Sequence, residues 1–168
     1  MPFEEVRSTS SEKWNKLLQT VSVETDNDTL KRLFYTHLYH AVQSPFMIQD
    51  EDGQYRGSDG KLYQKSEKPY FHGWSIWDTF RTKLPLISLL YPTTYSRMME
   101  SLGELYQQGK VHWATNTEPF LTVRTEHSII VLLEAHRKGL LPFSLDGIYP
   151  LLSLAAPALR FVIWLEPI

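Results

Sequence analysis

Apolar residues recur every three or four positions through most of the chain, and this spacing favours helices over any other regular structure. It predicts helices over residues 11–20, 28–43, 75–91, 92–108 and 124–138, and a sixth that begins near Ser144 or Asp146. In the third and fifth of these helices the apolar residues cover a wide arc, whereas the fourth has one apolar and one polar face. A ring of helices with an inner and an outer layer requires such an alternation. The sequence therefore predicts an all-α scaffold.

Residues near the ends of these segments are typical of helix starts and stops. Ser10 or Ser11 is expected to cap the first helix and Asp28 the second. Pro85 is expected to kink the third, because proline removes a backbone donor and clashes with the preceding turn. Gly139 is expected to end the fifth. The fourth is predicted to bury Tyr95, Met98, Met99, Leu102, Leu105 and Tyr106.

The helical period disappears over residues 46–73, and within this stretch two Asp-Gly steps flank short segments that resemble strands at residues 51–63. Asp-Gly favours tight turns between antiparallel strands, so this region is predicted to be an irregular hairpin inserted into the helical scaffold. Turn chemistry accounts for the Asp-Gly steps themselves. It does not account for Tyr55 and Arg56, which are candidates to line a pocket.

Charge and composition argue against several classes of function. Seventeen basic and nineteen acidic residues give a formal charge of −2, and no basic patch is present, so nucleic acid and anionic membranes are not expected partners. The absence of cysteine excludes disulfides and thiolate metal sites. No run approaches the roughly 20 apolar residues of a membrane span, and the first residues lack the pattern of a signal peptide. The histidine spacing of zinc hydrolases is also absent.

The start of the third expected helix combines aromatic and charged residues in a pattern that suits a sugar. Trp74 or Trp77 would stack on the apolar face of the ring, while Asp78 would accept hydrogen bonds from its hydroxyls. A purely structural explanation stays open. Ser75 and Asp78 have the spacing of a capping box, and Asp78 and Arg81 have the spacing of an ion pair on a helix.

The segment between the fourth and fifth expected helices contains the one candidate for a catalytic acid, Glu118, which lies in a loop before a buried helix. The neighbouring Glu126 has another explanation, because carboxylates are favoured in the first turn of a helix. His127 is expected to be a hydrogen-bonded core histidine.

Three segments in one order resemble glycoside hydrolase family 92: residues 34–40 (FYTHLYH), 52–61 (DGQYRGSDGK) and 74–81 (WSIWDTFR). The resemblance implies a calcium-dependent, inverting exo-α-mannosidase in which a β-sandwich precedes an (α/α)6 barrel and mannose binds where the two domains meet. It implies that Asp78 contacts the sugar, that mannose-containing glycans are the partners, and that the full-length enzyme is periplasmic or secreted. The calcium ligands are not identified in this chain.

The chain also departs from the family pattern. The chain is expected to lack the β-sandwich and the regions that hold the general acid, the general base and a calcium-binding Asn-Glu-Pro segment, which Thr117-Glu118-Pro119 matches only superficially. Inverting glycosidases need two carboxyl groups roughly 6.5–9.5 Å apart, and the sequence does not nominate both. Residues 1–160 are therefore expected to be the N-terminal part of the barrel, with 161–168 as a tail from outside the family.

Three functional hypotheses follow. The first is a truncated α-mannosidase that is inactive by itself, with apolar helix flanks that bind a complementary chain or a second copy. The second is a non-catalytic carbohydrate-binding or interaction module that keeps Trp77, Asp78 and Arg81. The third is a helical scaffold whose aromatic residues only fill the core.

Overall fold

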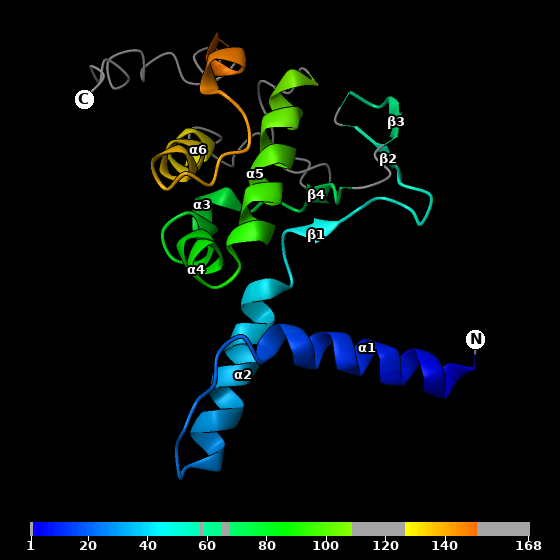
Figure 1. Cartoon of the computed structure of the whole chain (residues 1–168), viewed down its shortest axis with the longest axis vertical. Helices are drawn as coiled ribbons and strands as arrows, with labels where there is room; N and C mark the ends of the chain where they lie inside the picture. The colour runs from blue at the N-terminus through cyan, green and yellow to red at the C-terminus, as the bar shows by residue number, and fades with distance from the viewer. Residues whose placement is uncertain (1, 58, 65–67, 109–126, 151–168) are drawn as a thin grey trace. The chain divides into compact units, whose positions relative to one another are not determined.

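A computed structural model describes residues 2–57, 59–64, 68–108 and 127–150 of the chain, and these are mostly helical. The chain divides into two compact units, Met1–Gln43 and Ser44–Ile168. The helical fold class is confirmed, and the helices carry short strand pairs in addition (Figure 1). The proposed tail over residues 161–168 lies outside the described residues.

The first unit begins with α1 (Phe3–Leu18), which starts earlier in the chain than the sequence pattern predicts. Pro2 is at its N-cap, and Glu4 and Glu5 occupy the first turn, where carboxylates are stabilised by the helix dipole. Ser10 and Ser11 consequently lie inside the helix, so the prediction that one of them is the cap is wrong.

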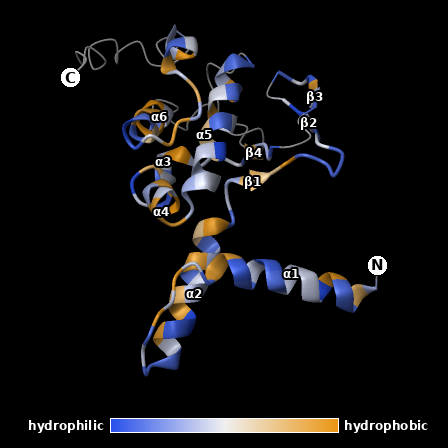
Figure 2. Cartoon of the chain, in the orientation of Figure 1, coloured by the Kyte–Doolittle hydropathy of each residue, from blue (hydrophilic) through white to orange (hydrophobic). Residues whose placement is uncertain are grey.

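The second helix of this unit, α2 (Asp28–Val42), has the predicted extent but a different cap. The side chain of Asn27, not Asp28, accepts hydrogen bonds from the backbone N–H groups of Thr29 and Leu30, at 3.0 and 3.1 Å. Asparagine and aspartate cap equally well, so local preference did not separate these adjacent residues. In Figure 2 apolar and polar residues alternate along α2.

The second unit is built around α5 (Pro92–Gln107), which has α4 (Lys83–Leu90) and α6 (His127–Arg137) on one side and the strand pairs on the other (Figure 1). The side chains predicted to face inward from α5 are all buried: Tyr95, Met98, Met99, Leu102, Leu105 and Tyr106. They form one core with buried residues of α4 and α6. The helical period therefore identified the correct inner face.

The third expected helix is two helices, α3 (Ile76–Thr79) and α4, separated at residues 80–82. Pro85 does not kink a helix, because it stands in the first turn of α4. The N–H groups of a first turn have no partner within the helix, so a proline there sacrifices no hydrogen bond. The prediction that Pro85 kinks the helix is therefore wrong, since the interruption lies at residues 80–82, before the proline.

Two antiparallel strand pairs complete the second unit. The predicted hairpin is present, since β2 (Gln54–Arg56) pairs with β3 (Leu62–Gln64) in a register that places Tyr55 opposite Tyr63. Another pair, β1 (Phe46–Met47) with β4 (Phe71–His72), was not predicted, because two-residue strands are too short to show a period. Gly73 follows β4 with a φ of +79°, which glycine adopts without strain.

The last described elements agree with the predicted boundaries. Gly139 follows α6 with a φ of +67°, as expected of a C-terminal cap. A 3-10 helix, η1 (Leu145–Gly147), is capped by Ser144, whose side chain accepts from the N–H of Asp146. Within the described ranges, no helix has both the length and the apolar character needed to cross a bilayer.

Candidate functional site

The predicted sugar-binding residues Trp77, Asp78 and Arg81 lie together on α3 and just after it. The Trp77 side chain is 42% exposed, and both charged side chains are exposed as well. Ser75 Oγ lies 3.4 Å from Asp78 Oδ2, a long hydrogen bond. An aromatic face, a carboxylate and a guanidinium are thus accessible to solvent within one short segment.

Asp78 stands in the first turn of α3, where the helix dipole favours a carboxylate, but the expected capping box and ion pair are not formed. Ser75 is at the N-cap of α3 but makes no side-chain capping bond. The described part of the chain contains no ion pair between Asp78 and Arg81. The Arg81 guanidinium instead lies 5.0 Å from the centroid of the Phe80 ring. Both charged groups therefore keep hydrogen-bonding capacity on their solvent side.

His127, expected to be a core histidine, lies against this segment. Its ring centroid is 5.3 Å from that of Trp77, nearly perpendicular at 82°, and 4.3 Å from that of Phe80. The side chain is only half-buried. No local pattern could have indicated this contact, because His127 and Trp77 belong to different helices, α6 and α3, that meet only in the folded unit.

Trp74 is part of the core and not of the exposed segment. Its side chain is 1% exposed, so its ring faces contact core residues and do not reach a ligand. Among the described residues, no acceptor pairs with its indole Nε1. Of the two tryptophans considered for stacking, only Trp77 has an accessible ring.

Tyr55 and Arg56 hold the hairpin together. The Tyr55 ring stacks between those of Tyr63 and Tyr70, with centroids 5.5 and 3.9 Å apart and both interplanar angles 18°. Arg56 Nη1 donates to the carbonyl oxygen of Gly60 at 2.6 Å, which ties the strand to its turn. In Figure 1 this hairpin lies on the other side of α5 from α3, so the structure does not bring Tyr55 or Arg56 to Asp78.

Burial in the tyrosine stack raises the pKa values of two of its phenols. Burial, and then the nearby Glu104 carboxylate, together raise the pKa of the Tyr55 phenol to about 12. Burial, and then the proximity of Tyr55, also raises the pKa of Tyr70 far above its usual range. Tyr55 Oη lies 3.4 Å from Glu104 Oε2 and from Gln108 Nε2. These phenols stay protonated at neutral pH, and their stacked rings pack the hairpin.

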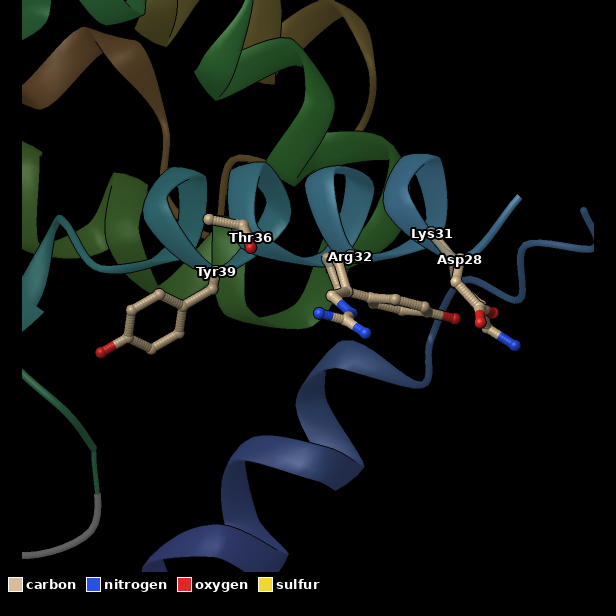
Figure 3. Close-up of a pocket in the computed structure, with 6 residues that line it drawn as sticks. Asp28, Lys31, Arg32, Thr36 and Tyr39 are labelled. Carbon is tan, nitrogen blue, oxygen red and sulfur yellow. The ribbon is translucent and has the colours of Figure 1, made fainter.

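The described residues contain no obvious metal site, and a groove is present in the first unit. No three histidine or carboxylate side chains of the described ranges lie close enough to hold an ion. A groove of about 610 Å³ belongs to the first unit, where side chains project from one face of α2 (Figure 3). It is lined by Asp28, Lys31, Arg32, Tyr35, Thr36 and Tyr39. Glu118, the candidate acid, lies outside the described residues.

Comparison with known proteins gives consistent matches. The model of the glycosyl hydrolase family 92 catalytic domain matches residues 1–158. The chain is similar to the solved family 92 α-mannosidase BT3965 from Bacteroides thetaiotaomicron, at 26% identity and a TM-score of 0.81 over 92% of this chain and 21% of that one. The same enzyme in complex with mannoimidazole matches at 27% identity and a TM-score of 0.76, with the same coverage of both chains, 92% and 21%.

A second family 92 glycosyl hydrolase, ccman5, matches at 30% identity and a TM-score of 0.77, over 92% of this chain and 22% of that one. The chain therefore spans about a fifth of the length of these solved proteins. No curated protein sequence matches it.

Proposed function

Because the chain belongs to glycosyl hydrolase family 92, we propose that it supplies one wall of the mannose site in an α-mannosidase catalytic domain. The similar BT3965 is an α-mannosidase that binds mannoimidazole, which supports mannose-containing glycans as the ligands. The helices of this chain would form part of the (α/α)6 barrel that the family resemblance implies.

The observation that carries the proposal is the joint exposure of Trp77, Asp78 and Arg81 on one short segment. A pyranose ring presents apolar C–H faces and a rim of hydroxyls. The Trp77 indole offers the apolar face, Asp78 accepts hydrogen bonds from hydroxyls, and Arg81 donates to their oxygens. Because Asp78 and Arg81 are not paired with each other, binding sugar costs no existing ion pair.

Hydrolysis requires more than this segment. Inversion uses two carboxyl groups on opposite sides of the sugar, roughly 6.5–9.5 Å apart. We assign Asp78 to sugar binding, and Glu118 lies outside the described residues. The residues of the described ranges do not fit calcium, so the ion would be bound elsewhere. Our proposal is that this chain alone binds mannose without cleaving the glycosidic bond.

A non-catalytic carbohydrate-binding module is the alternative, and the same exposed residues favour it. The two possibilities differ in what happens when the rest of a family 92 catalytic domain is present. If the chain is one wall of the active site, it contributes to hydrolysis in that setting. An independent module binds sugar but does not change the rate of hydrolysis.

The test is calorimetric titration of methyl α-mannoside into the purified chain, alongside hydrolysis of an aryl α-mannoside with and without calcium. We expect measurable binding and no hydrolysis. Asp78→Asn should weaken binding about tenfold or more, since hydrogen bonds to a charged group contribute about 1.5–3 kcal/mol.

Asp26→Asn makes the same charge change at an exposed residue of the first unit and should leave affinity unchanged. Equal binding by the wild type and Asp78→Asn would refute the assignment. Hydrolysis by this chain alone would refute the claim that it only binds the sugar.

A further inference from the structure

A continuous row of contacts joins the two ends of the exposed segment through a residue of another helix. His127 lies on α6, and its ring contacts both Trp77 and Phe80, with centroids 5.3 and 4.3 Å away. Phe80 in turn lies under the Arg81 guanidinium at 5.0 Å. The order of contacts is therefore Trp77, His127, Phe80, Arg81.

The ring geometry of this row is of the stabilising kind. The Trp77 and His127 rings meet edge to face at 82°, an arrangement that aromatic pairs prefer over face-to-face stacking. The Arg81 guanidinium lies within the roughly 6 Å over which a cation is attracted to an aromatic ring. Phe80 and His127 are both half-buried, so their rings can support the exposed side chains from below.

These contacts matter because Trp77 and Arg81 are exposed side chains with several rotatable bonds. Fixing a mobile side chain on binding costs free energy, which subtracts from affinity. An indole whose ring is already in contact with His127 loses less entropy when the sugar binds to its exposed surface.

We propose that His127 is a positioning residue of the sugar site: it holds the Trp77 indole directly and the Arg81 guanidinium through Phe80. The inference rests on the proposed function for its ligand. The ring arrangement itself is independent of any ligand, so the two can fail separately.

The first measurement is fluorine NMR of the chain labelled with 5-fluorotryptophan, without sugar. Trp77→Phe and Trp74→Phe assign the two resonances that matter. In His127→Ala the Trp77 resonance should move toward that of free 5-fluorotryptophan and sharpen, while the resonance of the buried Trp74 stays in place. His127→Phe, which restores a ring, should return the Trp77 resonance close to its wild-type position.

The matched control is His136→Ala, which removes an exposed histidine from the last turn of the same helix and should move neither resonance. An unchanged Trp77 resonance in His127→Ala would overturn the proposal. If alanine displaces Trp74 as well, the fold has changed, and His127→Gln takes its place. In that variant, a Trp77 shift with Trp74 in place supports the proposal, and any other result overturns it.

The second measurement is the affinity for methyl α-mannoside. His127→Ala should weaken it about threefold to tenfold, the range expected for loss of an aromatic pair, and His127→Phe should recover most of that loss. Unchanged affinity in His127→Ala would overturn the positioning role. If no variant and not even the wild type binds the sugar, the proposed function fails. The fluorine spectra then decide by themselves whether His127 holds Trp77.

Discussion

Replacing Leu102 with alanine tests whether α5 is the centre of the second unit. Leu102 is 0% exposed and belongs to a core to which α4, α5 and α6 all contribute. Truncating a buried leucine loses its transfer free energy and leaves a cavity, at a total cost of about 2.7–5.0 kcal/mol. Since buried side chains surround Leu102 on its own helix as well, little collapse is possible, and we expect about 3–5 kcal/mol.

That loss is a large part of the roughly 5–15 kcal/mol that stabilises a typical domain. It should lower the midpoint of thermal unfolding by about 10 °C, at roughly 2–4 °C for each kcal/mol. The assay is urea unfolding followed by circular dichroism, with stability taken from the midpoint and the slope. Leu102→Met, which keeps the volume, should cost less than about 1.5 kcal/mol.

The control is Leu89→Ala on α4, where the side chain is 77% exposed and the cost should stay within about 0.5 kcal/mol. A cost below about 1 kcal/mol for Leu102→Ala would refute the reasoning. So would equal costs for the two alanine variants.

Four further outcomes are expected. Because burial raises the pKa of Tyr55 to about 12 and the phenol in the unfolded chain titrates near 10, the folded chain holds a proton that the unfolded one loses. The free energy of unfolding should therefore fall as pH rises from about 10 to 12. Tyr55→Phe should make that fall shallower in urea titrations, and an unchanged fall would contradict the assignment. Gly139→Ala should cost about 1–2 kcal/mol for its φ of +67°, since nothing else lies near the added Cβ. Gly73→Ala should lower the stability by more than Gly139→Ala when both are measured by thermal unfolding, because its Cβ would also collide with the Phe46 ring. Equal losses of stability would argue against this packing. Leu33→Glu should reduce self-association in sedimentation velocity, because Leu33 is 48% exposed on α2, and no change would exclude this face as the contact between copies.

Burial along α5 could be predicted because one physical effect dominates there. A long helix with one apolar face has a single way to bury it, so the period of 3.6 residues selects the residues from Tyr95 to Tyr106 directly. The hairpin was predictable for a similar reason, since Asp59-Gly60 supplies the positive φ, +82° at Gly60, that its turn needs.

Predictions that depended on choosing between near-equivalent residues were less successful. Asn27 and Asp28 are adjacent and cap equally well, and the sequence pattern favoured the wrong one. Pro85 suggested a kink, although a proline in a first turn is compatible with a regular helix. Whether a residue stands in the first turn depends on where the chain leaves the previous helix, which tertiary packing decides.

The candidate site also has residues that the sequence could identify and residues that it could not. That Trp77, Asp78 and Arg81 face solvent agrees with their expected role, but the sequence could not distinguish Trp77 from Trp74, which is only three residues away and fully buried. His127 could not be recognised at all, because its contacts with Trp77 and Phe80 join different helices. Contacts of this kind arise from packing and have no local signature.

The most direct test of the central claim is a two-dimensional ¹H–¹⁵N NMR titration of the chain with methyl α-mannoside. A sugar held by the exposed segment should produce the largest shifts at the Trp77 indole N–H and at the backbone of Asp78 and Arg81. Shifts centred instead on Tyr35 and Tyr39, in the groove of α2, would place the sugar elsewhere and contradict the account. The absence of any shift at saturating sugar would contradict it equally.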